Sequence, residues 1–209
     1  MGNFKIIGIV GSHRVEPRNT YYLVERVLKV AGKGNEFETE IITLADKKLN
    51  YCTSCFECNH GPCPINDDMS EIYPKLLEAD AIVLGSPVYI YNVSGRMKTF
   101  IDRSRAVLFR KDANLKGKIG AGVVVGFVRN AGAEITAQAL RNFFEVHQMF
   151  YAGTVIGNSG RKGGVTNDDT GKMFAIQIGK RIKELLIQLK NVQLEYDKET
   201  VDKIHSKIY

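Results

Sequence analysis

The fold of this chain is decided by the segment FKIIGIV, residues 4–10, which continues into GSHR, residues 11–14. The run is apolar, rich in β-branched residues and ends at a glycine, as is typical of a strand buried in a parallel sheet. After a polar loop, residues 23–31 carry apolar side chains at helical spacing, and Gly32 and Gly34 end that pattern. A strand, a polar loop and a helix in this order form the repeating unit of an α/β fold.

The same alternation continues along the chain. Further strands are expected at residues 37–44, 81–85, 119–127 and 150–156. Further helices are expected at residues 67–78, 94–108 and 133–147, from Asp168 or Asp169 onward, and in a short stretch near 200–208. The long helix after Asp168 is expected to bury Phe174, Ile178, Ile182, Leu185, Leu186 and Leu189. This pattern predicts a doubly wound, five-stranded parallel sheet in one α/β domain, residues 1–190, followed by a C-terminal helical tail, residues 191–209.

The composition is that of an ordinary globular chain, with 209 residues, 44% of them apolar, a net charge of +6 and a pI near 9.1. Its basic residues are dispersed, and much of the excess falls on a solvated face of the long helix, so no nucleic-acid partner is expected. The positive charge can still attract an acidic electron-transfer partner. No apolar run approaches the ~20 residues of a membrane span, and no secretory signal is evident. We therefore expect a cytoplasmic protein with no membrane association.

All four cysteines lie in one window of twelve residues, at positions Cys52, Cys55, Cys58 and Cys63. Their spacing, C-x2-C-x2-C-x4-C followed by Pro64, differs by one residue from a bacterial ferredoxin pattern. The two-residue gaps let a short loop turn successive thiolates toward one centre. The spacing therefore favours a 4Fe–4S cluster held by a single cysteine-rich loop, residues 50–65, after the second strand.

Other interpretations of these cysteines stay open. Four thiolates can also hold a structural zinc ion, but such sites usually pair two C-x2-C units across a spacer of ~12–20 residues. Disulfides would need an oxidising compartment, and free redox-active thiols are the remaining possibility. His60 could be a ligand in a zinc site, whereas beside four thiolates it is expected at the surface.

Ligands of doubly wound sheets bind at the carboxyl ends of the strands, beside the point where the strand order reverses. The loops after the first, third and fourth strands are therefore expected to form the ligand site. The cysteine loop follows the second strand, so we expect it to open on the same edge.

The first of these loops predicts a phosphate site. Ser12, Arg14, Asn19 and Thr20 can hold one phosphate together with the N–H groups of the helix that follows. Neither G-x-G-x-x-G nor the P-loop pattern is present, so a mononucleotide is favoured over a dinucleotide. The alternative is an ordinary polar helix cap.

The other two loops supply features that suit a flavin ring. Pro87 stiffens the turn, Tyr89 or Tyr91 offers a flat apolar face, and a donor such as Arg129 near the ring would stabilise reduced flavin. The cofactor-binding residues expected from these two loops are Pro87, Val88, Tyr89, Asn92, Ser94, Gly95, Arg129 and Gly132. Packing in the core or at an interface is the alternative for the two tyrosines.

With these motifs, residues 3–190 resemble the flavodoxin-like NAD(P)H-dependent FMN reductase superfamily. The matching segments are GSHR at 11–14 with Asn19 and Thr20, and GSPVY at 85–89 with SGRMK at 94–98 and FIDR at 100–103. The compact cysteine run makes the chain similar to the iron–sulfur flavoproteins of anaerobic archaea and bacteria. The resemblance implies bound FMN, a 4Fe–4S cluster on the four cysteines, and a homodimer or homotetramer in which each cluster lies near the FMN of a neighbouring subunit. It also implies a ferredoxin-type electron donor and a small-molecule or protein acceptor.

Three functions follow as hypotheses. The first is electron transfer that couples a one-electron 4Fe–4S cluster to FMN. The second is an NAD(P)H-dependent FMN or quinone reductase whose cysteine loop is structural or binds zinc. The third is a redox or metal sensor that binds nucleic acid, for which no clustered basic face is apparent. No catalytic triad or acid–base pair is evident, His147 is expected to pack in the core, and His13 is expected near the phosphate or in solvent.

Overall fold

A computed structural model describes residues 3–14, 18–108, 114–160, 164–190 and 192. Its five strands form one parallel sheet in the order β2-β1-β3-β4-β5. The strands are β1 (Phe4–Val10), β2 (Phe37–Thr43), β3 (Ala81–Pro87), β4 (Ile119–Gly126) and β5 (Phe150–Asn158). The helices are α1 (Asn19–Ala31), α2 (Met69–Glu78), α3 (Gly95–Arg103), α4 (Arg105–Leu108), α5 (Ala133–Val146) and α6 (Asp169–Leu189), with the 3-10 turns η1 (Glu57–Asn59) and η2 (Gly164–Asn167).

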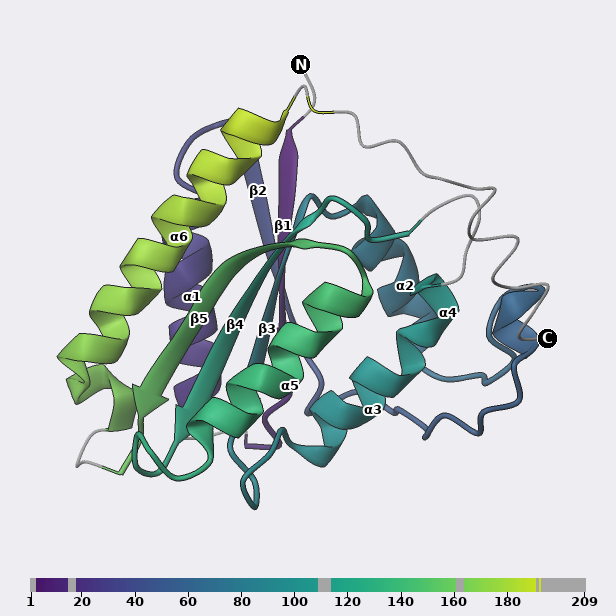
Figure 1. Ribbon diagram of the computed structural model, residues 1–209, viewed down its shortest axis with the longest axis horizontal. Helices are drawn as coiled ribbons and strands as arrows, with labels where there is room; N and C mark the ends of the chain where they lie inside the picture. Colours follow the sequence, from purple (N-terminus) through teal and green to yellow (C-terminus); the bar gives the residue numbers. More distant parts are fainter. Residues whose placement is uncertain (1–2, 15–17, 109–113, 161–163, 191, 193–209) are drawn as a thin grey trace.

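The helices cover both faces of the sheet (Figure 1). On one face, α1 and α6 pack on β-branched side chains of β1, β3 and β4. On the other face, α2, α3, α4 and α5 bury a second apolar cluster centred on Phe100, Phe143 and Phe144. The central strands β3 and β4 are buried along almost their whole length, as the continuous apolar runs require. The predicted doubly wound sheet is confirmed.

Two details differ from the sequence-based expectation, and a third is not tested. The helix predicted at 94–108 is interrupted at Ser104, whose backbone N–H bonds to the carbonyls of both Phe100 and Ile101, and α4 starts anew at Arg105. Phe174, expected to face the core, is 41% exposed because α6 buries only the stripe that faces α1 and β5. The predicted stretch at 200–208 lies outside the described residues.

The strand order places the reversal between β1 and β3, because the chain crosses from one face of the sheet to the other there. Parallel strands carry their carboxyl ends to one edge, so the loops after β1, β3 and β4 meet at this edge, at the bottom of Figure 1. Every functional residue predicted from these three loops is thereby brought to one end of the sheet.

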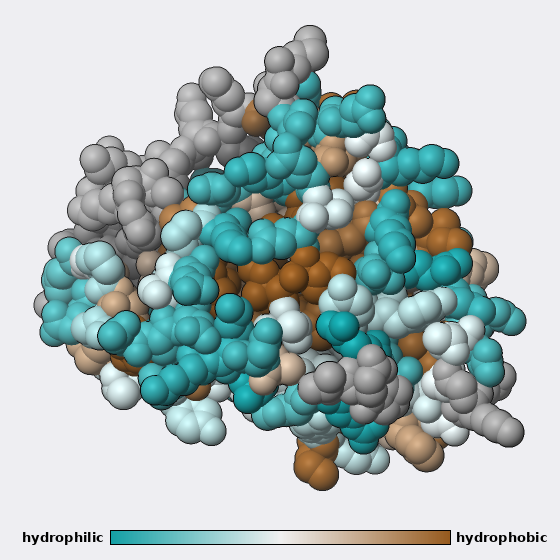
Figure 2. All heavy atoms as spheres, turned by 180° about the vertical axis from the view of Figure 1, so that it is seen from behind, coloured by the Kyte–Doolittle hydropathy of each residue, from teal (hydrophilic) through white to brown (hydrophobic). Residues whose placement is uncertain are grey.

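The surface is predominantly polar. Seen from behind, hydrophilic side chains surround a strip of apolar atoms in the middle of the face (Figure 2). Among the described helices, none has the length and apolar character needed to cross a lipid bilayer.

Candidate cofactor sites

The loops after β1 and β3 are joined by buried hydrogen bonds. The Gly11 N–H donates to the Gly85 carbonyl at 2.8 Å, and the Ser94 hydroxyl donates to the Gly11 carbonyl at 2.5 Å. Ser94 also caps α3, since its Oγ accepts from the Met97 N–H, and its own N–H donates to the Ser86 hydroxyl. The fully buried Ser94 therefore builds the site by holding two loops together, and the exposed Gly95 opens the helix beside it.

The predicted phosphate residues gather at the start of α1. Ser12 is buried and its hydroxyl accepts from the Arg14 N–H at 3.2 Å, while the Arg14 side chain is exposed. Thr20 is buried, and Asn19 accepts through its side-chain oxygen from the Val165 N–H. The first turn of α1 contains no acidic residue, and the side chain of its N-cap residue, Arg18, makes no capping hydrogen bond within the described part of the chain. Its N-terminal N–H groups therefore provide a favourable electrostatic environment for an anion.

The loop after β3 forms a tight hairpin that the sequence did not predict. Tyr89 and Asn92 exchange two backbone hydrogen bonds, of 2.9 and 3.1 Å. Between them, Ile90 and Tyr91 both have positive φ, 45° and 60°. Two left-handed residues in a two-residue loop define a type I′ turn, which normally contains Asn or Gly. Ile90 and Tyr91 are neither, so this turn could not be predicted from residue preferences.

The loop after β4 closes against this hairpin. Gly132 has a φ of +81°, and a Cβ at this position would lie 2.6 Å from the Tyr91 Cα. Only glycine therefore permits this contact between the two loops. Arg129 points to the other side of its loop, where it donates to the Ile156 carbonyl at 2.5 Å and to Asp168 at 2.6 Å. One of its nitrogens is engaged by β5 and the other by the N-cap of α6, so its predicted role beside a flavin stays a prediction.

His13 and Arg96 connect the first loop to its neighbours. Arg96 donates to His13 Nδ1 at 3.0 Å and to the carbonyls of Leu44 and Lys47. The His13 ring stacks on Tyr89, with 6.3 Å between the ring centroids. Burial, reinforced by the Arg96 guanidinium, lowers the pKa of His13, so the neutral ring is favoured. The role of Arg96 in joining the two loops was not predicted.

Apolar side chains project into solvent around this edge. Ile90 is 94% exposed and Phe127 75% exposed. The exposed apolar side chains at this edge are called here the apolar rim; they are Tyr89, Ile90, Tyr91, Phe127 and Val128. The rim lies beside the polar start of α1, so the edge combines an anion-binding end with flat apolar side chains. The N–H groups at the start of α1 fit the phosphate of FMN, and the apolar side chains of the rim fit its ring.

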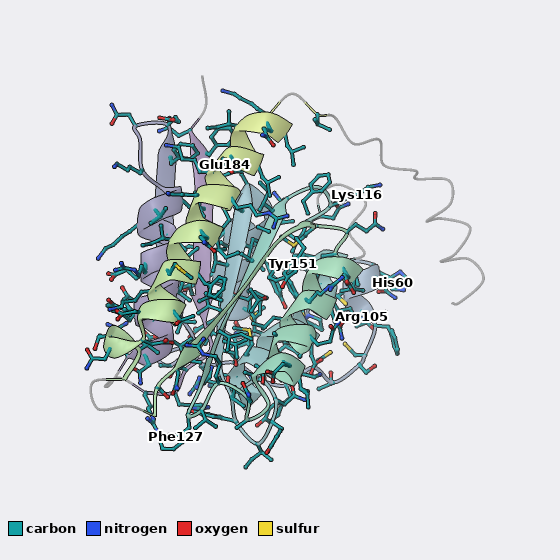
Figure 3. All side chains as sticks on the ribbon, turned by 60° about the vertical axis from the view of Figure 1, so that its left-hand side comes forward. His60, Arg105, Lys116, Phe127, Tyr151 and Glu184 are labelled. Carbon is teal, nitrogen blue, oxygen red and sulfur yellow. The ribbon has the colours of Figure 1, made fainter. Side chains whose placement is uncertain are left out.

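The cysteine loop leaves the sheet at the expected edge, but it does not stay beside the flavin loops. Its 3-10 turn η1 contacts α4, and the loop runs beside the junction of α3 and α4 (Figure 1). There the Cys63 sulfur lies 3.6 Å from Arg103 Nη2. Arg105 at this junction lies over the Phe56 ring at 4.7 Å and donates to Asn59. The nine residues of α3, about 14 Å of helix, separate this junction from Ser94. Figure 3 shows the same separation, with Phe127 at the lower end of the molecule and Arg105 and His60 at its side.

The donor chemistry of the loop fits an iron–sulfur cluster. Cys52 and Cys55 are exposed, and Cys58 and Cys63 are half-buried. Burial raises the pKa of Cys58, the nearby Arg105 opposes this, and the other three cysteines each raise it further, so all four thiols share one electrostatic environment. Ser54 and Phe56 have positive φ and turn the chain between the cysteines. Within the described residues, no three cysteine, histidine or acidic side chains form a preassembled metal site, so metal binding would draw the sulfurs together.

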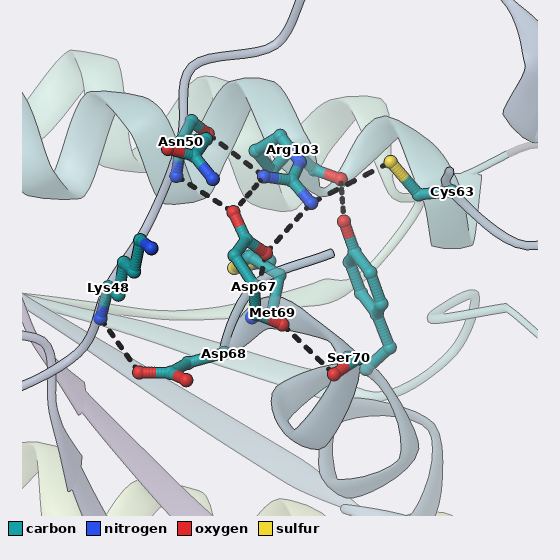
Figure 4. A network of polar contacts seen from close by, with 9 residues as sticks. Lys48, Asn50, Cys63, Asp67, Asp68, Met69, Ser70 and Arg103 are labelled. Carbon is teal, nitrogen blue, oxygen red and sulfur yellow. Dashed lines mark hydrogen bonds and ion pairs between the residues drawn. The ribbon is translucent and has the colours of Figure 1, made fainter. Parts of the chain in front are cut away.

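Behind the loop lies a buried polar network that the sequence did not predict (Figure 4). Arg103 and Asp67 form an ion pair at 2.6 Å whose side chains are at most 1% exposed. Arg103 Nη1 also donates to the Asn50 carbonyl at 2.9 Å, and Nη2 lies 3.6 Å from the Cys63 sulfur. Burial alone would raise the pKa of Asp67, but the Arg103 guanidinium and two backbone N–H groups outweigh it and lower that pKa. The network therefore holds a charged guanidinium against the sulfur of Cys63.

Comparison with known proteins identifies the family. The sequence pattern of the NADPH-dependent FMN reductase family matches residues 4–162. An iron–sulfur flavoprotein of Methanocaldococcus jannaschii is 42% identical over 197 residues, which span 89% of this chain and 99% of that protein. The chain is an iron–sulfur flavoprotein of the FMN reductase family. An iron–sulfur flavoprotein of Methanosarcina thermophila is 35% identical, over 87% of this chain and 95% of that protein.

Solved structures agree on the fold. RosB, with a bound 8-demethyl-8-formylriboflavin-5'-phosphate, has a TM-score of 0.72 at 17% identity, over 99% of this chain and 88% of RosB. A flavodoxin from the domain Archaea has a TM-score of 0.55 at 18% identity, over 87% of this chain and 97% of that chain. The family predicted from the sequence is thus confirmed, and the two predicted cofactors are those that the names of these flavoprotein relatives carry.

Proposed function

We propose that this protein transfers electrons between an iron–sulfur cluster on the cysteine loop and FMN at the carboxyl edge of the sheet. A ferredoxin-type protein would supply the electrons, and a small molecule or another protein would accept them. The observation that supports this most directly is that one chain carries two separate sites of different chemistry, four thiols at one and an anion-binding edge with exposed aromatic side chains at the other. The cluster exchanges single electrons and FMN exchanges one or two, so together they link one-electron carriers to two-electron acceptors.

At the flavin site, each loop has a distinct task. The N–H groups at the start of α1, with Ser12 and the Arg14 side chain, would bind the phosphate. The hairpin at Tyr89–Asn92 and the loop at 126–132, which pack against each other, would together position the ring. When a partner molecule covers the apolar rim, the rim would exclude water from the flavin site.

At the cysteine loop, Cys52, Cys55, Cys58 and Cys63 would hold a 4Fe–4S cluster. Arg105 lies on the protein side of this loop and would offset part of the negative charge that four thiolates and the cluster bring, and Arg103 Nη2 lies against the Cys63 sulfur. His60 is exposed, and a cluster held by four thiolates would need no further ligand from it.

The distance between the two sites supports assembly from more than one copy. Within one chain, α3 separates the Arg103–Arg105 junction from the flavin loops. A second copy that covers the apolar rim would bring its cysteine loop to this flavin and bury the exposed aromatic side chains. A homodimer or homotetramer is therefore part of this proposal.

Anaerobic purification tests the proposal. We expect about four iron and four sulfide per chain and about one FMN, and stoichiometric reduction of the flavin on addition of a reduced ferredoxin. Zinc in place of iron, with flavin reduced by NAD(P)H but not by ferredoxin, would instead support a reductase with a structural cysteine loop. Absence of flavin would contradict both.

A further inference from the structure

We propose that Arg103 positions and tunes the cluster, because its buried guanidinium donates a hydrogen bond to the sulfur of Cys63 and so favours the reduced cluster. The inference rests on the proposed function, in which Cys63 is a cluster ligand. It concerns a residue on α3, outside the cysteine loop, and it explains why a polar network lies beneath that loop.

The geometry fixes the guanidinium in one orientation. Nη1 is shared between Asp67 at 2.6 Å and the Asn50 carbonyl at 2.9 Å. Nη2 is shared between Asp67 at 3.1 Å and the Cys63 sulfur at 3.6 Å. The two-pronged contact with one carboxylate sets the plane of the group, so its remaining donor direction is aimed at the sulfur.

The rest of the network keeps Arg103 in place. Asp67 is itself held by the N–H groups of Asn50 and Met69 at 2.7 and 3.1 Å. The Tyr73 hydroxyl donates to the Arg103 carbonyl at 3.0 Å. These contacts come from the segment before the cysteines, from the segment after them and from α2, so the donor is fixed relative to both ends of the loop.

Stability alone gives little reason for such a pair. Replacement of a buried ion pair by apolar residues of similar volume is often neutral or stabilising. Here, moreover, the Arg103 Nε is buried with no hydrogen-bond partner among the described residues, which adds a desolvation cost. The presence of a buried guanidinium at this desolvation cost is better explained by its hydrogen bond to the Cys63 sulfur.

The effect on the cluster has a definite sign. Reduction adds one negative charge to the cluster and its thiolates, and a hydrogen bond to a ligand sulfur stabilises that added charge. Asp67 neutralises the positive charge of Arg103. The effect of Arg103 on the cluster therefore comes mainly from its hydrogen bond to the Cys63 sulfur. Loss of this donor therefore lowers the reduction potential of the cluster.

Two variants separate this role from folding. Arg103→Lys retains a cation for Asp67 but loses the fork, and the double variant Asp67→Asn with Arg103→Gln removes both charges and leaves no buried carboxylate unpaired. We expect both to bind iron, sulfide and FMN. At a fixed potential, we expect at least a tenfold lower ratio of reduced to oxidised cluster, equivalent to 59 mV for one electron. The FMN potential of the same sample is the internal reference and is expected to stay unchanged.

Arg141→Lys is the matched control, because Arg141 pairs with Glu145 on the exposed side of α5. It is expected to leave both potentials unchanged. Cluster-loaded Arg103→Lys with the wild-type cluster potential would overturn the inference while the proposed function stands. Wild-type protein without iron would overturn the proposed function and this inference with it.

A second measurement needs no change at Arg103. The arginine guanidinium groups are labelled with ¹⁵N in protein that carries Arg105→Lys, so that Arg103 is the labelled arginine beside Cys63. The protein is then reduced, and electron–nuclear double resonance is recorded on the cluster signal. We expect a ¹⁵N coupling from Arg103. Absence of this coupling in iron-loaded protein would overturn the inference, even if the variants at Arg103 fail to assemble a cluster.

Discussion

His147 at the end of α5 is a buried histidine whose tautomer is set by its neighbours. It is 3% exposed, and its ring lies 4.5 Å from that of Phe143. The Ser104 hydroxyl donates to the Ile101 carbonyl, so it accepts from His147 Nε2 at 2.9 Å. Nδ1 then has no proton, and it has no hydrogen-bond partner in the described part of the chain. The predicted packing of His147 in the core is confirmed.

This arrangement predicts a pH dependence of stability. Burial lowers the pKa of His147 to about 4, from 6.5 for an ordinary histidine. Between these pH values the unfolded chain binds the proton and the folded chain does not, so the free energy of unfolding falls as the pH falls from about 6.5 to 4. This difference in pKa corresponds to about 3 kcal/mol of unfolding free energy.

Urea unfolding at several pH values checks this prediction. His147→Gln keeps a donor for Ser104 but cannot be protonated, so its stability should decline less than that of the wild type over this range. Parallel pH profiles of the two proteins would contradict the assigned protonation. Acid loss of the cofactors is common to both proteins and cancels in the difference.

At the scale of single elements, the hairpin Tyr89–Asn92 combines backbone strain with exposure. Ile90 is β-branched, 94% exposed and left-handed, with a φ of 45°. Such a conformation costs about 1–2 kcal/mol for an L-residue. Strain retained at the edge of a cofactor site favours a role in binding over a role in stability.

We therefore expect Ile90→Asn with Tyr91→Gly to raise the free energy of unfolding by about 1–2 kcal/mol and to weaken FMN binding. Thermal unfolding and flavin fluorescence titration measure the two effects. The matched control is Gln148→Gly, because Gln148 also has a positive φ, 54°, but follows α5 at the opposite end of the sheet. It should stabilise the fold without a change in FMN affinity. A double variant that is less stable than the wild type would contradict the assignment of strain.

The cysteine loop is a second element with its own prediction. Its contacts run to the α3–α4 junction, so the flavin loops do not depend on it within one chain. Cys58→Ala is expected to abolish the cluster, with loss of iron and sulfide, while at least half of the FMN remains bound. Thr53→Ala in the same loop is the control and should retain both cofactors. Loss of FMN in Cys58→Ala would show that the loop helps to form the flavin site in the assembly.

At the scale of the whole molecule, the apolar rim and the separation of the two sites predict an oligomer. The mass in solution should be a multiple of 23.3 kDa. Phe127→Lys places a charge on the rim and should shift the protein toward the monomer, with slower electron transfer from cluster to flavin. Light scattering and stopped-flow absorbance measure these effects.

Ile187→Lys, at a position 52% exposed on α6, is the control and should change neither property. A monomeric wild type whose transfer rate does not depend on protein concentration would contradict assembly as the means of bringing the two cofactors together.

Sequence alone determined the elements and their chemistry. The order of strands and helices follows from hydrophobic periodicity, which is a local property, and the spacing of the four cysteines favours a 4Fe–4S cluster. The tertiary structure decided what depends on contacts between distant segments. Arg103 appears in the sequence as a residue near the end of a helix, and only the folded chain brings it to Asp67 and Cys63, 36 and 40 residues away.

The position of the cysteine loop was likewise settled by packing. The rule for parallel strands fixes where the loop leaves the sheet. The thirteen residues 44–56, between β2 and η1, form no helix or strand and carry no periodicity that fixes the course of the loop. Contacts with Arg103 and Arg105 hold it against the α3–α4 junction, at the far end of α3 from the flavin loops. The type I′ turn was hidden for a related reason, because surrounding contacts impose a conformation that Ile90 and Tyr91 do not prefer by themselves.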